Sequence, residues 1–259
     1  MSKRAKITEA FKKCLPIIPV ILLCALTVAS LIKSFEVPPQ DKIQINNYSN
    51  FHPTSYKKAV KKSRESAVQV ISLTPNSAMM ASSSGTYFVA FGNHFVITVM
   101  HGLQGPCELT KMVYEEKIYK CIKYIALDPY NDYAIIQTEE IDNRTPIKIP
   151  GDLPKNRQWL NSYSIMNKLV YTGFPNTIGP LTISGEVAGF GGSEYLYIIS
   201  YAWQGSSGSG VFDKNGKYIG YVVAVDVGQT ELGIQVLENL VLIAPAFKVD
   251  WTKAITEAE

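Results

Sequence analysis

The sequence predicts an all-β protein that contains two small antiparallel barrels. Short runs rich in β-branched and aromatic residues, such as 95–100, 133–136 and 218–225, recur beyond Ser55. Glycine, asparagine and proline residues separate these runs, as expected for strands joined by turns. The chain beyond Ser55 is long enough for two barrels of this kind. An N-terminal membrane-spanning helix and a short C-terminal helix complete the predicted fold.

The first predicted element is an uncharged apolar segment, residues 15–32. As a helix it would span roughly 27 Å, close to the ~30 Å hydrocarbon core of a bilayer. Only Thr27 and Ser30 interrupt it, which makes a buried core helix with a polar stripe the weaker interpretation. We expect an uncleaved transmembrane anchor. The alternative is a signal peptide that is cleaved after the small residues at 27–29.

Basic residues are concentrated ahead of this segment. Residues 1–14 carry a net charge of +4 and the remaining chain carries −1, within a total of +3. The positive-inside rule places residues 1–14 in the cytoplasm and the C-terminal domain outside it, in a periplasmic or extracellular location. The nearly neutral domain lacks the basic stripe that nucleic acids require, so we expect no nucleic-acid partner. The lysine-rich cluster at 57–64 predicts a solvated helix face or, at most, a contact with anionic lipid headgroups.

The composition after the anchor defines the remaining organisation. Residues 33–54 are rich in proline, asparagine and serine, which is typical of a tether. Residues 55–259 form the main domain, with the first barrel at about 64–147 and the second at about 148–250. The last residues, 245–259, predict a closing helix.

A glycine- and serine-rich loop, residues 205–210, lies between two strand-like runs. Glycines around a serine let the backbone turn tightly and present one hydroxyl together with neighbouring N–H groups. The central Ser207 is therefore the candidate nucleophile. A flexible linker is the alternative interpretation, but such linkers usually join polar segments.

A serine hydroxyl needs a base that removes its proton. The chain has three histidines. His52 lies in a polar stretch and His94 in an expected hairpin turn, so His101, at the end of an apolar run, is the candidate base. Asp132 immediately precedes the next short apolar run and is the candidate orienting acid, with Asp128 as the alternative.

The chain order His101, Asp132, Ser207 is that of chymotrypsin-fold proteases. More narrowly, the chain from about 55 to 255 resembles the HtrA (Deg) family of trypsin-like serine proteases. The resembling segments are 56–60, 67–71, 85–89, 96–101, 131–136, 173–175, 182–187 and the serine loop.

This resemblance implies two six-stranded antiparallel β-barrels with the active site in the cleft between them. It implies hydrolysis of a protein or peptide substrate, with the backbone N–H groups of Gly205 and Ser207 as the oxyanion hole. It also implies no cofactor and allows a homotrimer.

Two of the chain's departures from related proteases bear on its activation and domain organisation. Trypsin-like zymogens have an aspartate just before the nucleophile, which pairs with a newly cut N-terminus, but this chain has Ser206 there. We therefore expect no activation by such a cut. HtrA proteins generally carry a C-terminal PDZ domain, whereas the present sequence stops at Glu259. We expect a membrane-anchored form that lacks this domain.

The same resemblance implies a substrate pocket with Tyr201 at its base and Val223, Ala224 and Val225 along its wall. None of these side chains carries a charge, and burying an unpaired charge is costly. We therefore expect a small or medium apolar residue before the scissile bond.

The four cysteines fall into two pairs. Cys14 and Cys24 lie at or inside the predicted anchor. A hairpin around residues 115–117 would bring Cys107 and Cys121 near each other, either as a disulfide or as two free thiols. We expect no metal site, because no second pair of histidines or cysteines has ligand spacing.

Together these inferences predict a membrane-anchored serine endopeptidase that acts in extracytoplasmic protein quality control or regulated proteolysis. Two other classes of function remain open: a proteolytically silent binding or scaffold protein on the same fold, and an esterase acting on small substrates.

Overall fold

The structure is a computed structural model of the 259-residue chain, and it describes residues 56–76, 79–150, 163–230 and 233–256. These residues all belong to one compact unit, 52–259. Within them, no helix is both long and apolar enough to cross a membrane. The predicted cytoplasmic segment 1–14, the anchor 15–32 and the tether 33–54 lie outside the described residues.

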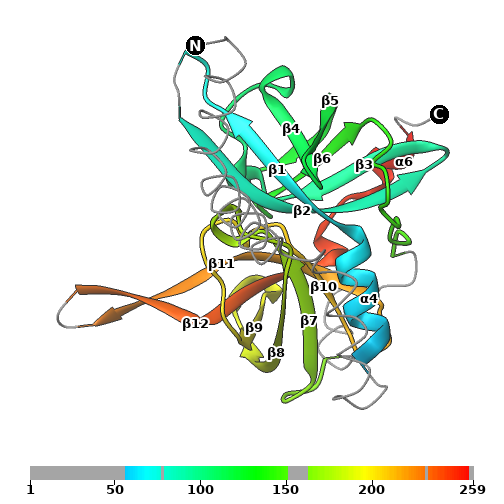
Figure 1. Ribbon diagram of the computed structural model, residues 1–259. Coiled ribbons are helices and arrows are strands. Elements are labelled where there is room, and N and C mark those ends of the chain that lie inside the picture. Colours follow the sequence, from blue (N-terminus) through cyan, green and yellow to red (C-terminus); the bar gives the residue numbers. More distant parts are fainter. Residues whose placement is uncertain (1–55, 77–78, 151–162, 231–232, 257–259) are drawn as a thin grey trace, which may run out of the picture. The chain divides into compact units, whose positions relative to one another are not determined.

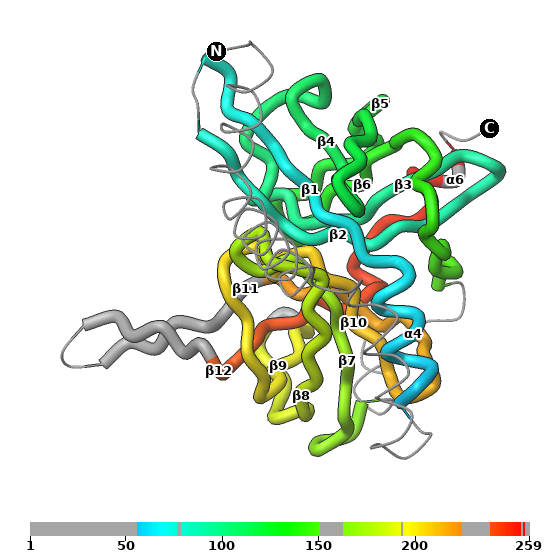
Figure 2. The backbone as a smooth tube through the Cα atoms, viewed as in Figure 1, coloured from blue at the N-terminus to red at the C-terminus, as the bar shows by residue number. Residues whose placement is uncertain are grey.

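Twelve strands in the described residues form two closed antiparallel barrels of six strands each (Figure 1). The predicted pair of six-stranded barrels is therefore confirmed. Figure 2 follows the backbone through the first barrel, then through the second.

The first barrel has the strand order β1-β2-β3-β6-β5-β4. Its core contains Val68, Val70, Val96, Met112 and Ile136, all fully buried. Val68 and Val70 alternate along β1, so one face of this strand points into the barrel. The strands are β1 (Ala67–Leu73), β2 (Met80–Ala90), β3 (Asn93–Thr98), β4 (Thr110–Tyr114), β5 (Lys117–Asp128) and β6 (Tyr133–Thr138).

The second barrel has the order β10-β11-β12-β9-β8-β7, and Val187, Ile198, Val211 and Val241 are fully buried in its core. In each barrel two pairings join strands that are not consecutive in the chain: β3 with β6 and β1 with β4 in the first barrel, and β9 with β12 and β7 with β10 in the second. Closure of each barrel therefore requires pairing between strands that are distant in sequence. The strands are β7 (Lys168–Gly173), β8 (Leu181–Phe190), β9 (Leu196–Ile199), β10 (Gly210–Phe212), β11 (Tyr218–Thr230) and β12 (Gly233–Pro245).

Among the described residues, two α-helices flank the barrels. Helix α4 (Lys57–Ser66) precedes β1, buries Ala59 and Val60, and leaves its lysines exposed. Its Arg64 is buried and donates a 2.8 Å hydrogen bond from Nη1 to Thr182 Oγ1 in β8. The 3₁₀ helices of the described residues are η2 (Met100–Gly102), η3 (Cys107–Leu109), η4 (Pro175–Thr177), η5 (Gly192–Glu194) and η6 (Ala246–Lys248).

The predicted C-terminal helix is confirmed as α6 (Trp251–Thr256). Its Trp251 packs edge-on against Phe88 of the first barrel and Tyr218 of the second, with ring centroids 5.4 and 6.0 Å away. The indole Nε1 donates to Ala246 O over 2.8 Å, so the buried N–H has a partner. This one side chain therefore packs against both barrels.

The structure decides between the two states left open for the cysteines. Cys107 and Cys121 form a disulfide, with their Cα atoms 5.3 Å apart. Strands β4 and β5 form a hairpin whose register pairs Lys111 with Lys120. Cys107 lies just before β4 and Cys121 lies in β5, so the hairpin brings the two sulfur atoms together.

We expect loss of this disulfide to destabilise the domain. A cross-link over a separation of 14 residues contributes about 3 kcal/mol, mainly by restricting the unfolded chain. Replacing both Cys107 and Cys121 by serine should lower the free energy of unfolding by about that amount, measured by urea unfolding of the full chain in detergent. A variant with serine at Cys14 and Cys24 is the control. Equal unfolding midpoints for the two double variants would contradict the prediction.

Candidate active site

His101 and Asp132 lie at the same edge of the first barrel. Strands β3 and β6 are antiparallel neighbours, and Thr98 pairs with Ala134. The end of β3 therefore lies beside the start of β6. His101 follows β3 within η2, and Asp132 immediately precedes β6. The pairing of these two strands brings together residues that are distant in sequence.

The two side chains form a tight pair. His101 Nδ1 and Asp132 Oδ2 are 2.5 Å apart, and the backbone N–H of His101 donates to Asp132 Oδ1 over 2.9 Å. The Met100 N–H donates to the Asp132 carbonyl over 3.3 Å. The His101 side chain is 52% exposed and the Asp132 side chain 23%. One ring nitrogen is thus held by the carboxylate while much of the ring remains accessible.

Asp132 adopts a left-handed backbone conformation, with φ of 52°. Residues other than glycine rarely do so, although aspartate tolerates it better than most. This conformation turns the chain into β6 while both the carboxylate and the carbonyl of Asp132 accept hydrogen bonds from residues 100 and 101. These contacts offset the cost of the turn.

Asp128 has a different set of partners. Its carboxylate accepts hydrogen bonds from the N–H groups of Tyr130 and Asn131, over 2.8 and 3.0 Å, and from Asn131 Nδ2 over 3.0 Å. Partial burial raises the pKa of Asp128, but the hydrogen bonds from Asn131 and Tyr130 outweigh it, and the net pKa is lowered. Asp128 thus stabilises the turn that leads to Asp132, and the geometry favours Asp132 as the partner of His101.

The serine loop depends on glycine at two positions. Gly205 has φ of 94° and Gly208 has φ of 88°. A Cβ atom on Gly205 would lie 2.7 Å from the carbonyl oxygen of Phe174, and one on Gly208 would overlap the carbonyl oxygen of Ser84. Both residues therefore need the positive φ that glycine permits and the space left by its missing side chain.

Contacts with Ser84 in β2 hold the serine loop against the first barrel. The Ser84 N–H donates to the Ser207 carbonyl over 2.8 Å, and its hydroxyl donates to the Gly205 carbonyl over 2.7 Å. The Ser84 carbonyl accepts a 2.6 Å hydrogen bond from Thr98 Oγ1. Thr98 is three residues before His101 in the chain. The structure thus brings the loop that carries Ser207 to the strand that leads to His101.

The three serines of this loop differ in exposure and bonding. Ser206 and Ser209 are buried. The Ser206 hydroxyl accepts from the Trp203 N–H over 3.1 Å, and the Ser209 hydroxyl donates to the Ser206 carbonyl over 2.6 Å. Ser207 is partly exposed. Among the described residues its hydroxyl has no hydrogen-bond partner, His101 included, so it is the serine that a substrate can reach.

The backbone amides of the loop also differ. Ser206 N–H donates to the Trp203 carbonyl over 2.8 Å, and Gly208 N–H donates to the Val222 carbonyl over 2.7 Å. In the part of the chain that the structure describes, the N–H groups of Gly205 and Ser207 have no protein acceptor. These are the two donors that the sequence predicts for the oxyanion hole.

The structure describes part of the predicted substrate pocket. Tyr201 is 60% exposed and stacks on Trp203, with ring centroids 6.2 Å apart. Val223 is buried in β11. The side chains of Ala224 and Val225 lie outside the description. The assignment of these four residues to a pocket therefore remains a prediction.

Residues of the second barrel also support the loop before Asp132, and the sequence gives no signal for them. The buried Tyr221 of β11 donates from its hydroxyl to the Asn131 carbonyl over 2.6 Å. Burial raises the pKa of Tyr221 well above its usual value, which keeps this donor protonated. Lys248 Nζ lies 3.4 Å from Asn131 Oδ1 and 4.6 Å from the centroid of the Tyr195 ring.

The two remaining histidines do not lie at this site. His94 Nδ1 is 2.5 Å from the Tyr87 hydroxyl and the two rings stack, which gives His94 a structural role. His52 lies outside the described residues. In the described residues, no three histidine, cysteine or acidic side chains gather in a way that could hold a metal ion.

Solved structures share this fold. A serine endoprotease from Yersinia pestis has a TM-score of 0.59 and 19% identity over 78% of this chain and 67% of its own. The Rv3671c protease from M. tuberculosis, in its active form, has a TM-score of 0.58 and 16% identity over 78% and 86%. The HtrA-type protease AlgW, solved with a tripeptide, has a TM-score of 0.57 and 16% identity over 75% and 62%.

No family model and no curated protein matches the chain. The barrel topology and the structural neighbours together define the chain as a chymotrypsin-fold protein. All three neighbours are described as proteases, one as a serine endoprotease and one as an HtrA-type protease. Function on this fold is decided by the site.

Proposed function

We propose that this chain is a serine endopeptidase in which Ser207, His101 and Asp132 form the catalytic triad. The observation that carries the proposal is the 2.5 Å contact between His101 Nδ1 and Asp132 Oδ2, beside a glycine-bounded loop with one accessible serine. Because Nδ1 is paired with Asp132, the other ring nitrogen, Nε2, is available to accept the proton of the Ser207 hydroxyl. Hydrogen bonds of this kind are often long in an empty site and shorten when substrate binds.

The reaction proceeds by acyl transfer. His101 removes the proton of the Ser207 hydroxyl as its oxygen attacks a peptide carbonyl, and Asp132 stabilises the imidazolium that forms. His101 then protonates the leaving amine, and water releases the acyl group. The negative charge that develops on the carbonyl oxygen is stabilised by hydrogen bonds from the N–H groups of Gly205 and Ser207. Among the described residues these two N–H groups have no other hydrogen-bond acceptor.

The proposal is tested with the full chain in detergent. A fluorophosphonate probe should label one serine, located by mass spectrometry at Ser207, and the protein should cleave a quenched fluorescent casein. Labelling together with hydrolysis of small esters, but without cleavage of any protein, would identify an esterase. The absence of both labelling and cleavage would identify a silent scaffold protein and overturn the proposal.

Gly205 provides a test of the oxyanion hole. In a Gly205→Ala variant the new methyl group would lie 2.7 Å from the Phe174 carbonyl oxygen and the backbone would be strained at φ of 94°. The amide should move, and loss of one such donor costs about 10² to 10³ in rate. We expect that loss in casein cleavage. The control is Gly189→Ala, because a methyl group there has no atom within 4 Å. Equal rates for the two variants would contradict the assignment.

We further propose that the protein is anchored through residues 15–32 with its protease domain outside the cytoplasm. The Cys107–Cys121 disulfide supports this location, because disulfides persist in oxidising compartments. The HtrA resemblance supports a role in protein quality control or regulated proteolysis and allows a homotrimer. The uncharged pocket residues support a preference for small apolar residues before the scissile bond.

Topology has its own test. In intact cells, protease added from outside, after permeabilising any outer membrane, should digest the C-terminal domain, and the protein should resist carbonate extraction. Both results follow from an uncleaved apolar segment preceded by a basic one. A cytoplasmic protein of similar size is the control for membrane integrity. A soluble form that begins near Ser30 would show that the segment is a cleaved signal peptide.

A further inference from the structure

The hydroxyl of Ser84 is a buried junction between three segments of the chain. Ser84 lies in β2 and is fully buried. Its Oγ accepts a hydrogen bond from the Phe174 N–H over 2.8 Å and donates one to the Gly205 carbonyl over 2.7 Å. One side chain of the first barrel is therefore bonded both to the segment that follows β7 and to the serine loop.

The three segments are closely packed at this junction. Gly173 precedes Phe174, and a Cβ atom there would lie 2.6 Å from Ser84 Oγ. A Cβ atom on Gly205 would lie 2.7 Å from the Phe174 carbonyl oxygen and 3.3 Å from the Asn176 nitrogen. In a close-packed interior, a shift of one segment displaces the others.

Hydrogen bonds also fix the peptide group that carries the Gly205 N–H. The Gln204 carbonyl belongs to that group and accepts from the Asn176 N–H over 2.7 Å. Because the carbonyl and the N–H of a trans peptide point in opposite directions, the Gly205 N–H points away from Asn176. The next peptide group contains the Gly205 carbonyl, which Ser84 holds. Both peptide groups that flank the Gly205 Cα are therefore held.

We propose that Ser84 is a positioning residue for the oxyanion hole, because its hydroxyl fixes the direction of the Gly205 N–H. This inference rests on the proposed function, since it concerns the same site. Ser84 acts directly through the Gly205 carbonyl and also, through Phe174, on the segment that reaches Asn176. Oxyanion donors depend on a preorganised geometry, and a displacement of about 1 Å can cost about 10² in rate.

Loss of the hydroxyl should disturb this geometry. In Ser84→Ala the Gly205 carbonyl and the Phe174 N–H would lose their shared partner in a buried environment. Leaving such groups unpaired is costly, so the peptide groups should rotate towards other partners. Glycine permits this rotation more readily than other residues. The backbone N–H of Ser84 would still donate to the Ser207 carbonyl, so Ser207 should keep its place.

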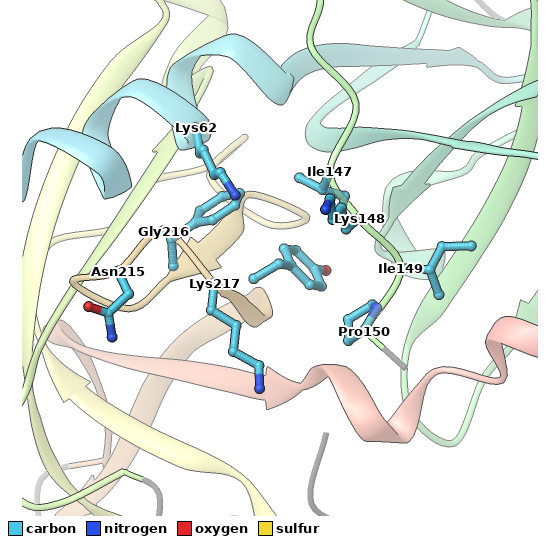
Figure 3. Close-up of a pocket in the computed structure, with 10 residues that line it drawn as sticks. Lys62, Ile147, Lys148, Ile149, Pro150, Asn215, Gly216 and Lys217 are labelled. Carbon is cyan, nitrogen blue, oxygen red and sulfur yellow. The ribbon is translucent and has the colours of Figure 1, made fainter. Parts of the chain in front are cut away.

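The test compares Ser84→Ala with Ser63→Ala in the full chain in detergent. Ser63 is also buried, and its hydroxyl also has two partners, the Val60 carbonyl over 3.1 Å and the Thr172 hydroxyl over 2.8 Å. It lies in helix α4 beside Lys62, which lines a hollow of about 270 Å³ with no residue of the proposed triad in its lining (Figure 3). Ser63→Ala therefore removes a comparable set of hydrogen bonds in another part of the domain.

Hydrolysis of a quenched fluorescent peptide from casein gives kcat and KM for each variant. Ser84→Ala should lower kcat by about 10-fold to 100-fold. Its KM should stay within about twofold of the parent value, because the oxyanion hole acts in the transition state. Ser63→Ala should keep kcat within about twofold, with a similar urea midpoint to Ser84→Ala. If Ser84→Ala fails to fold, Ser84→Cys, which keeps a weak donor, should show the same fall in kcat at unchanged KM.

A double variant shows where Ser84 acts. Adding Ser84→Ala to Gly205→Ala should lower kcat by no more than about a further twofold, because residues that act as a unit are not additive. Full multiplication of the two losses, or equal kcat values for Ser84→Ala and Ser63→Ala in an active parent, would overturn the role of Ser84 and leave the Ser207 chemistry intact. An inactive parent would overturn the proposed function and this inference together.

Discussion

Replacing Ser207 by alanine is expected to abolish fluorophosphonate labelling and to lower peptide hydrolysis by about 10⁶-fold, because no other group of the site can form the acyl-enzyme. The backbone should change little, since the Ser207 carbonyl would still accept from the Ser84 N–H. The measurement compares labelling and casein cleavage by the full-length parent and variant. Turnover at the parent rate in Ser207→Ala would refute the assignment of the nucleophile.

The neighbouring serine provides a matched control. Ser209 is in the same loop, but its buried hydroxyl donates to the Ser206 carbonyl. Ser209→Ala should lower the free energy of unfolding by about 1 kcal/mol, the contribution of one hydrogen bond, and should keep its labelling. If Ser207→Ala and Ser209→Ala both lost labelling and were equally unfolded, the loss in Ser207→Ala would be explained by disruption of the loop and would not identify Ser207 as the nucleophile.

Asp132→Asn is expected to lower turnover by about 10⁴-fold. In the parent protein Asp132 Oδ2 lies 2.5 Å from His101 Nδ1. The carboxylate accepts a hydrogen bond from Nδ1–H, so Nε2 can accept the proton of the Ser207 hydroxyl. An amide N–H at the position of Oδ2 would donate to Nδ1, move the ring proton to Nε2 and leave no acceptor for the Ser207 hydroxyl. The pre-steady-state rate of acylation by an ester substrate measures this step directly.

Asp128→Asn separates the two acids. Asp128 accepts its hydrogen bonds from Tyr130 and Asn131, so its loss should weaken the turn while leaving the proton transfer intact. Because its folded pKa is lowered, the stability that Asp128 contributes is present above its unfolded pKa and is lost as the pH falls through the folded value. Full activity in Asp132→Asn together with a large loss in Asp128→Asn would reverse the assignment of the acid.

Several features of the fold could be predicted from local patterns. The runs 95–98 and 133–136 are strands in which every residue is buried, because burial removes their mostly apolar side chains from water. It was also predictable that an acid would lie beside His101, because His101 ends one such run and both Asp128 and Asp132 precede another. The choice between Asp132 and Asp128 needed the structure, since both precede the same strand and only the turn geometry separates their partners.

The state of Cys107 and Cys121 could not be read from the sequence. Whether two sulfur atoms can bond depends on the distance and direction between their side chains, and these follow from the register of the β4–β5 hairpin. Ser84 and Tyr221 were missed for a related reason. Both donate hydrogen bonds to backbone carbonyls of segments that are distant in sequence. Because every residue type has a backbone carbonyl, no pattern in the sequence marks the acceptor.

The sequence by itself determined which residues can do chemistry: a serine between glycines, a histidine and an aspartate at strand ends, and an uncharged N-terminal segment. These are local properties of composition and spacing. Only the tertiary structure decided where the serine loop lies, because its position depends on Ser84 and on glycines that permit close approach of the two barrels.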